Sequence, residues 1–272
     1  MRDFAFLEKI IIGQYLPIDS WLHKRHPVSK LISFFVLLCG VTVSINLSGL
    51  LIGLGAVIIL LTAGKIQLRH VLRGLLLPLP FLIILAIIQL FFPSINTHGK
   101  PLMDVFGFEI YREGLFAAVR LLLRFCVLVL LLSVSSATLS DLQFVHGLES
   151  LLKPLKLKTN YIVMTAQITL RFIPVIALNA EKVAKAQASR GAAWGTKKGS
   201  LIKRVRQMIP LLVPLVNNSL KQADTIADAM LARGFGSASE RTSLTDYRMT
   251  VSDWVLIIIS SLISVVIIWF PG

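Results

Sequence analysis

Residues 186–191 read Ala-Gln-Ala-Ser-Arg-Gly, and residues 229–234 read Ala-Met-Leu-Ala-Arg-Gly. Each motif closes a long run of helical composition in the stretch from 159 to 234, and each has the pattern Ala-x-x-x-Arg-Gly. Glycine after a helix adopts the left-handed conformation that ends it, and a cation suits the negative end of the helix dipole. One copy is an ordinary helix stop. Two copies in one basic segment favour a paired docking device.

The composition indicates an integral membrane protein. Of the 272 residues 55% are hydrophobic, and the mean hydropathy is +0.77, whereas soluble domains are about 45–50% apolar. The formal net charge of +14 could point to nucleic acid. However, residues 137–252 hold 16 Lys and Arg against 7 Asp and Glu, so nine of the surplus charges lie in one segment between spans. Such loops are typical of the cytoplasmic side of a membrane, and we expect no nucleic-acid partner.

Hydrophobic runs predict an all-α integral membrane protein with about five transmembrane helices and long cytoplasmic helices. Residues 4–16 form a shorter apolar stretch, which we expect to lie at the membrane interface. Prolines 78 and 80 fall near the first turn of the third span, where proline is tolerated. The glycines at 49, 53, 55 and 64 favour close packing of the second span. The five predicted spans are residues 31–47, 50–63, 75–92, 114–138 and 251–270.

Loop charges predict the orientation of these spans. The basic regions are the N-terminal entry, residues 65–73 and the large segment after the fourth span, whereas the loop at 93–113 has a net charge of −1. The positive-inside rule therefore puts the N-terminus and the large segment in the cytoplasm. The acidic loop and Gly272 are expected outside. Residues 1–20 lack the features of a cleaved signal peptide.

The predicted organisation has three parts: a membrane domain at 1–136, a cytoplasmic helical domain at 137–250, and a last transmembrane helix at 251–272. Ser140 is expected to cap a helix at 142–152. A helical run follows at 161–190, and Pro174 is expected to interrupt it. The next run, at 201–233, is expected to break at Pro210 and Pro214, since prolines inside helices cause bends.

Several motifs in this order resemble the transmembrane T component of energy-coupling factor (ECF) transporters. The resemblance covers most of the chain, and its specific motifs lie between residues 138 and 241. Besides the two Arg-Gly motifs they are Gly-Leu-Glu at 147–149, Leu-Lys-Pro-Leu at 152–155, Leu-Arg-Phe-Ile-Pro at 170–174 and Ile-Pro-Leu-Leu-Val-Pro-Leu at 209–215.

The resemblance implies a coupling subunit in a bacterial cell membrane. T components join two ABC-type ATPase subunits to a membrane S component, which captures a vitamin or a metal ion. Their long coupling helices cross, and two arginine-containing tripeptides dock on the ATPases. The matching docking residues here are Ser189, Arg190, Gly191, Ala232, Arg233 and Gly234. The first tripeptide begins with serine where alanine is common. The matching bend and packing residues are Arg171, Pro174, Pro210 and Pro214.

No catalytic set or cofactor is expected in this chain. It lacks the Gly-x-x-x-x-Gly-Lys-Ser/Thr phosphate loop, His-Glu-x-x-His and Gly-x-Ser-x-Gly, so the resemblance leaves ATP and Mg²⁺ to partner ATPases. His23 and His26 have the i, i+3 spacing of a metal pair, but no Cys, Asp or Glu nearby completes a ligand set. A polar membrane interface is the favoured interpretation, and no metal site is expected.

Two other functions stay open at this stage. An intramembrane enzyme acting on lipid would need a polar cluster inside the spans, which offer Arg120, Arg124, Gln89 and hydroxyl residues. A stand-alone carrier or channel would need charged or broken helices at the midplane. Arg120 and Arg124 share one helix face and lie near the outer end of their span. They either snorkel to the interface or meet another subunit.

Overall fold

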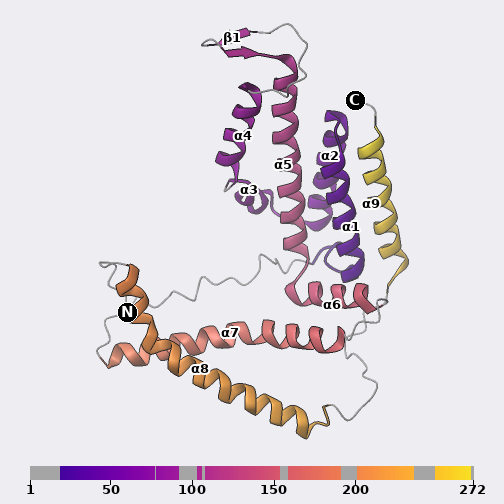
Figure 1. Ribbon diagram of the computed structural model, residues 1–272. Helices are drawn as coiled ribbons and strands as arrows, with labels where there is room; N and C mark the ends of the chain where they lie inside the picture. The colour runs from indigo at the N-terminus through magenta and orange to yellow at the C-terminus, as the bar shows by residue number, and fades with distance from the viewer. Residues whose placement is uncertain are drawn as a thin grey trace. The chain divides into compact units, whose positions relative to one another are not determined.

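The computed structural model describes residues 19–76, 78–91, 103–105, 108–153, 159–190, 201–235 and 249–270 (Figure 1). The chain divides into two compact units. One comprises residues 13–157 and 247–272, and we call it the membrane unit. The other comprises residues 1–12 and 158–246, and we call it the long-helix unit. Each is described by itself. The predicted interfacial stretch at 4–16 lies outside the described residues.

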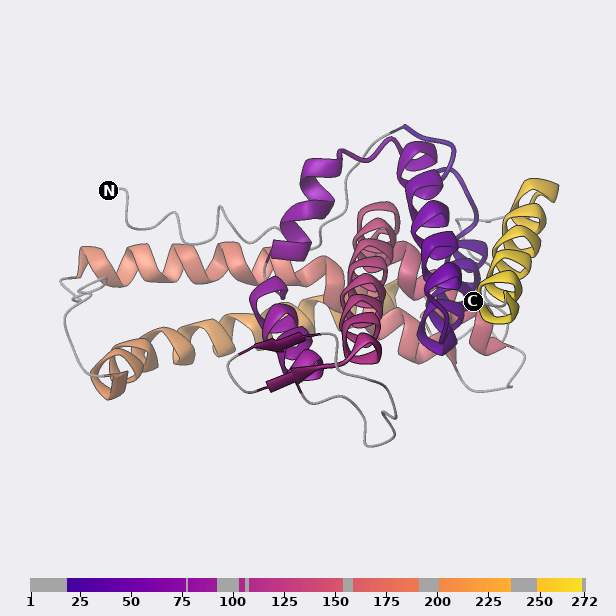
Figure 2. The ribbon, with the colours of Figure 1, turned by 90° about the horizontal axis from the view of Figure 1, so that it is seen from above.

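The membrane unit is a bundle of apolar helices with α5 at its centre. Helix α5 packs against α4 on one side and against α1 and α2 on the other, and α9 packs along α1 and α2 (Figure 2). The core residues lie mainly on α1, α2 and α5. The helices of this bundle are α1 (Pro27–Val43), α2 (Leu47–Gly64), α3 (Leu68–Leu76), α4 (Leu79–Phe91), α5 (Arg112–Thr138) and α9 (Val251–Trp269).

Five of these helices, α1, α2, α4, α5 and α9, correspond to the five predicted spans. The predicted third span at 75–92 differs at its start, because its first residues belong to α3 and Pro78 precedes α4. Pro78 has no backbone N–H to donate and is best tolerated near a helix start, which is where it lies. By length and composition α2, α5, α9 and residues Tyr161–Ser189 of α7 could cross a membrane, and α1 and α4 are shorter apolar helices.

Glycines let α9 approach α1 and α2 closely. A Cβ on Gly40 of α1 would collide with Ser264, and one on Gly49 of α2 would collide with the backbone carbonyl of Ile267. The predicted role of small residues in close packing is therefore confirmed at Gly49. It is wrong at Gly55, where a Cβ would meet nothing within 4 Å.

A short β-hairpin was not expected from the sequence. Strands β1 (Met103–Val105) and β2 (Phe108–Ile110) pair antiparallel, with Met103 opposite Ile110. The hairpin lies in the predicted acidic loop. Each strand has a charged residue between two apolar ones, a period-two pattern too short to stand out from a loop.

Helix α6 (Asp141–Leu152) begins where the sequence predicts. The Ser140 hydroxyl accepts a hydrogen bond from the Gln143 backbone N–H at 3.3 Å, and the Gln143 side chain accepts one from the Ser140 N–H at 3.5 Å. This reciprocal pair is a capping box. Helix α6 packs against α1 and so belongs to the membrane unit, whereas the predicted domain boundary at 136/137 separates it from α1.

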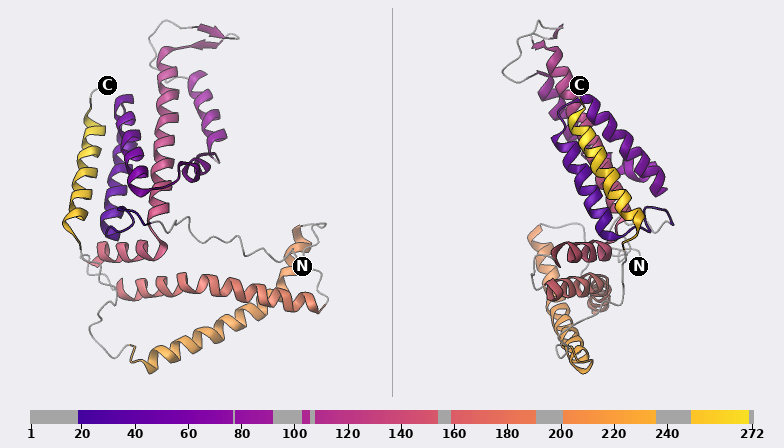
Figure 3. Two further views of the ribbon diagram at one scale, coloured as in Figure 1. Left: turned by 180° about the vertical axis from the view of Figure 1, so that it is seen from behind. Right: turned by 90° about the vertical axis from the view of Figure 1, so that its right-hand side faces the viewer.

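The long-helix unit contains α7 (Thr159–Ser189) and α8 (Leu201–Ala232). The two helices pack on each other and cross (Figures 1 and 3). The prolines that were predicted to bend the two runs do not end either helix: α7 runs through Pro174, and α8 runs through Pro210 and Pro214. The ribbon of α8 changes direction within its first half, which holds both prolines (Figure 1).

Candidate docking ends of the two long helices

Helix α8 ends as the second Arg-Gly motif predicts. Gly234 has a φ of 74°, in the left-handed region. Its N–H donates to the Leu231 carbonyl at 2.9 Å, and the Phe235 N–H donates to the Met230 carbonyl at 2.9 Å. This pair of bonds is a Schellman motif, which closes a helix at the residue before the glycine. Arg233 therefore occupies the C-cap position, directly after the last residue of α8, for a local reason.

Helix α7 ends at the first Arg-Gly motif. The Ser189 hydroxyl donates to the Ala186 carbonyl at 2.8 Å, and the Arg190 N–H donates to the Gln187 carbonyl at 3.1 Å. These bonds tighten the last turn and leave the Arg190 side chain outside it. Gly191, predicted as the stop residue, lies outside the described residues.

Both arginine side chains are exposed, as are Ser189, Ala232 and Gly234. In the described part of the chain, no ion pair or side-chain hydrogen bond holds either guanidinium. The C-terminal ends of α7 and α8 lie at opposite ends of the crossed pair (Figures 1 and 3). The unit thus presents two separate cationic ends rather than one combined site.

The contact between α7 and α8 includes a polar pair. The Asn179 amide donates to the Gln222 side-chain oxygen at 3.5 Å. Gln222 belongs to a half-buried row on α8 whose spacing of three and four residues places it on one helix face. That row is Leu211, Pro214, Leu215, Ser219, Gln222, Ile226 and Met230. Pro214 therefore lies in the row, whereas Pro210, Pro174 and Arg171 are exposed.

A second apolar row on α8 is exposed. Its members again recur every three or four residues and are large aliphatic side chains: Ile209, Leu212, Val213, Val216 and Leu220. Such a helix has two apolar faces, of which a single partner helix can cover one. The exposed row offers apolar surface to another contact.

A buried polar corner in the membrane unit was not predicted from the sequence. Lys30, which directly precedes the predicted first span at 31–47, is completely buried. Its Nζ donates to the carbonyls of His23 at 2.8 Å and Thr138 at 3.1 Å, and to the Gln143 side chain at 3.4 Å. These three acceptors match the three donors of an ammonium group. Lys30 thus joins the segment before α1 to the turn between α5 and α6.

Asp253 fixes the start of α9 in the same corner. One carboxylate oxygen accepts from the His26 N–H at 3.0 Å and from the Ser29 hydroxyl at 3.3 Å. The other accepts from the Thr250 N–H at 2.8 Å and from its hydroxyl at 2.7 Å. A carboxylate with this many donors is well satisfied although it is buried. His26 and Ser29 lie more than 200 residues from Asp253 in the sequence, so local patterns do not predict these contacts.

The histidines at 23 and 26 contribute to the corner individually. The His23 ring is joined to the Ser20 hydroxyl at 2.6 Å and to the Ala137 carbonyl at 3.3 Å. The His26 ring accepts from the Val28 N–H at 3.1 Å and caps α1. The two rings therefore have different hydrogen-bond partners within the corner.

The two arginines of α5 contact the turn between α1 and α2. Arg124 donates to the Ser44 carbonyl, and Arg120 donates to the Ile45 carbonyl at 3.3 Å. Asn46 in the same turn donates to the Phe270 carbonyl at 2.8 Å. These bonds satisfy carbonyls at a helix end. The sequence alternatives, snorkelling or a subunit contact, did not include this internal role.

Together these features define an all-α integral membrane protein, apart from its short hairpin, that also carries a crossed pair of long helices with two exposed arginine ends. Comparison with known proteins gives the particular family. Residues 19–244 match the family model described as CbiQ, cobalt transport protein. The chain belongs to this family.

Curated relatives cover nearly the whole chain. The energy-coupling factor transporter transmembrane protein EcfT of Exiguobacterium sibiricum is 35% identical over 267 residues, which are 97% of this chain and 99% of that protein. The protein of the same name from Thermosediminibacter oceani is 31% identical over 95% of this chain and 97% of its own length. That of Bacillus subtilis is 30% identical over 97% and 98%. The resemblance drawn from the sequence motifs is confirmed.

Proposed function

We propose that this chain is the transmembrane coupling component of an energy-coupling factor transporter. In this role it transmits ATP binding and hydrolysis in two partner ATPases to a membrane S component that takes up a vitamin or a metal ion. ATP and Mg²⁺ are bound by the ATPases. The observation that carries the proposal is the pair of exposed arginine ends, one at each end of a crossed helix pair.

Arginine suits docking at these ends. Its planar guanidinium forms two parallel hydrogen bonds with a carboxylate, which fixes orientation as well as charge. Arg190 and Arg233 have no such partner within the described residues, so a groove on an ATPase can supply it. The exposed apolar row of α8 adds contact area, because charges alone mainly set register and association rate.

The proposed topology keeps the N-terminus and the long-helix unit in the cytoplasm and places the C-terminus outside. Helix α7 is apolar and long enough to cross a bilayer. We nevertheless assign it to the cytoplasm, because its second half carries a Lys185–Glu181 ion pair at 2.5 Å and Asn179 pairs with Gln222 of charged α8. Charged groups at membrane depth are costly.

Cysteine labelling tests this topology. In a chain whose Cys39 and Cys126 are replaced by Ala, single cysteines at positions 99 and 272 should react with an impermeant maleimide from outside. A cysteine at position 199 should react only after the membrane is permeabilised. Reaction at 199 in sealed cells would place the long-helix unit outside and remove the basis for ATPase docking.

The central experiment separates docking from folding. The full chain is co-expressed with its ATPase and S-component partners, and its affinity tag is used to capture them. Truncating one side of a buried charge pair costs about 2–5 kcal/mol of binding. Arg190→Ala or Arg233→Ala alone should sharply reduce uptake while part of the complex still purifies, because two linked contacts reinforce each other. The double variant should release both ATPases.

The matched control is Lys182→Ala, which removes another exposed cation of α7 away from its end. It should retain both ATPases. The thermal stability of the detergent-purified double variant should equal that of the wild type. If the double variant captured both ATPases and supported normal uptake, the two motifs would be simple helix stops. A chain that captured no nucleotide-binding protein at all would instead support a stand-alone carrier or an intramembrane enzyme.

A further inference from the structure

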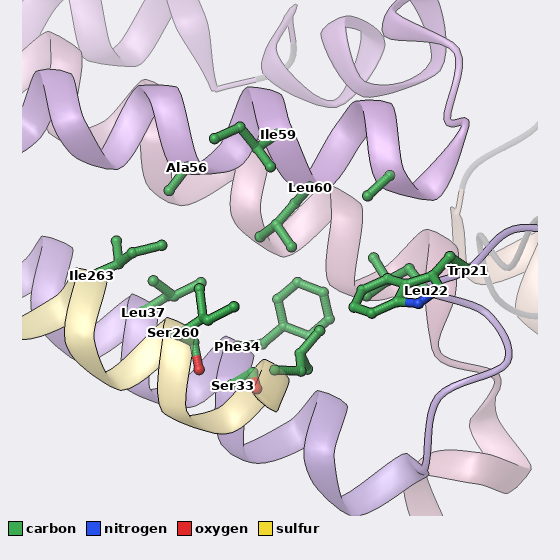
Figure 4. A pocket seen from close by; sticks show the side chains of 13 residues that line it. Trp21, Leu22, Ser33, Phe34, Leu37, Ala56, Ile59, Leu60, Ser260 and Ile263 are labelled. Atoms are coloured by element: carbon green, nitrogen blue, oxygen red, sulfur yellow. The ribbon is translucent and has the colours of Figure 1, made fainter. Parts of the chain in front are cut away.

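A cavity of about 180 Å³ opens between α1, α2 and α9 of the membrane unit. Figure 4 shows Phe34 and Leu37 of α1, Leu60 of α2 and Ile263 of α9 around it, with Trp21 and Leu22 at one end. Its lining is aliphatic or aromatic except for Ser33 and Ser260. Water does not fill a cavity of this composition, because it would lack hydrogen-bond partners. An apolar occupant fits it.

One polar group in the wall has no partner. Ser33 is 5% exposed, and its hydroxyl has no hydrogen bond within the described residues. The other wall serine, Ser260, donates to the Ile257 carbonyl at 2.9 Å. A buried hydroxyl is normally satisfied, and serine in a helix usually bonds the carbonyl four residues earlier. Ser33 therefore has a donor to offer to an occupant of the cavity.

The Trp21 end of the cavity holds two cations, Arg25 and Lys24, whose neighbouring carboxylates are Asp253 and Asp19. Trp21 is 47% exposed, and the Arg25 guanidinium lies over its ring at 4.2 Å from the centroid. The Arg25 Nε is buried and has no hydrogen-bond partner in the described part of the chain. Next to it, the Lys24 side chain is exposed and reaches Asp19 at 3.8 Å. Tryptophan with adjacent cations is typical of the headgroup level of a membrane.

We propose that this cavity binds one acyl chain of an anionic phospholipid, with the phosphate against Lys24 and Arg25 and an ester carbonyl accepting from Ser33. The end that holds Lys24 and Arg25 selects this occupant over an apolar partner helix, which would offer no anion. The lipid acyl chain packs against the aliphatic wall of the cavity. This site goes beyond the coupling role and needs neither ATPase nor S component. The test of lipid binding is therefore independent of the test of the proposed function.

The fluorescence of Trp21 can report lipid binding in this cavity. Replacing Trp194, Trp254 and Trp269 by Phe leaves Trp21 as the single tryptophan of the full chain. This chain is placed in phosphatidylcholine vesicles with increasing fractions of phosphatidylglycerol brominated on one acyl chain. Bromine quenches tryptophan fluorescence on contact. Quenching of Trp21 should saturate at a mole fraction about tenfold lower than brominated phosphatidylcholine requires, because phosphatidylglycerol has a net negative charge, whereas the choline cation of phosphatidylcholine is repelled by Lys24 and Arg25.

Two wall variants test the cavity itself. Ala56→Phe fills it and should abolish the saturable quenching, whereas Ile58→Phe, on the same helix but 51% exposed and outside the lining, should not. Ser33→Ala removes a hydroxyl that has no partner among the described residues, so the thermal stability should be unchanged. The half-saturating mole fraction should nevertheless rise roughly fivefold, as expected for one hydrogen bond.

The charge variant tests the headgroup. Lys24→Gln with Arg25→Gln should bring the half-saturating fraction of phosphatidylglycerol to that of phosphatidylcholine. Equal quenching by both lipids in the single-tryptophan chain, or quenching that Ala56→Phe leaves unchanged, would show ordinary contact with surrounding lipid and overturn the proposal. Loss of the phosphatidylglycerol preference in the assembled transporter would overturn it too, because a partner helix would then fill the cavity.

Discussion

The membrane unit and the long-helix unit use cations in opposite ways. Lys30 is completely buried, and backbone carbonyls and one side-chain amide occupy all three of its donors. Arg190 and Arg233 are exposed at helix ends, without such partners in the described residues. A buried and fully paired charge fixes the fold around it. An exposed charge on a rigid helix end contributes little to folding and remains available to a partner.

The largest expected effect is at the buried cation. Lys30→Ala leaves the carbonyls of His23 and Thr138 buried without a donor, and unsatisfied buried groups of this kind cost roughly 2–5 kcal/mol in total. The variant should lose most of its folded yield and melt at a much lower temperature in a detergent thermal-shift assay. Lys24→Ala, at an exposed neighbour, should be close to the wild type. Similar melting temperatures of the two variants would show that the buried Lys30 contributes no more to folding stability than the exposed Lys24.

The next effect concerns the exposed cations. Replacing both Arg190 and Arg233 by Lys keeps the charge and removes the planar fork. The melting temperature should not change, but capture of the ATPases should fall to an intermediate level, between the wild type and the double Ala variant. Full capture would show that charge alone is sufficient at these ends.

The bend in α8 gives a third prediction. Replacing Pro210 and Pro214 together by Ala should improve local helix propensity by up to about 3 kcal/mol per proline. Uptake should nevertheless fall, because a straightened α8 would point Arg233 in another direction. Transport assays on the double variant, with expression as control, measure this. Unchanged uptake would mean that the direction of α8 before Arg233 is unimportant.

A smaller effect is expected at the helix stop. Gly234→Ala forces an alanine into a left-handed φ of 74°, which costs about 1 kcal/mol. The end of α8 should fray, and ATPase capture should weaken by several-fold without any change in melting of the membrane unit. Gly55→Ala, where a Cβ meets open space, is the matched control and should have no effect on capture.

The smallest effect is expected at the polar pair between the long helices. Asn179→Ala removes one neutral hydrogen bond of 3.5 Å to Gln222, and such bonds contribute about 0.5–1.5 kcal/mol. Uptake should fall by less than twofold in transport assays. A complete loss would show that Asn179 does more than join α7 to α8.

Much of this protein could be predicted because its decisive signals are local. A helix stop depends on the residues within one turn, so the Schellman end at Gly234 and the capping box at Ser140 follow from short motifs. Apolar helices depend on local composition, so α1, α2, α4, α5 and α9 could be placed from their apolar runs, with an error at Pro78. The family could also be predicted from the sequence, because each of its motifs is a contiguous stretch of the chain.

Tertiary structure decided what depends on residues distant in sequence. Lys30 became a core residue only because the turn at Thr138 and the start of α6 meet it, and Asp253 only because α9 returns beside α1. The carbonyls held by Arg120 and Arg124 belong to another helix pair, and Ser33 faces a cavity walled by three helices. The burial and partners of a polar side chain depend on packing, which composition and spacing do not encode. For this reason the sequence predicted the positions of the two arginine helix ends, and the fold alone determined which cations are internal.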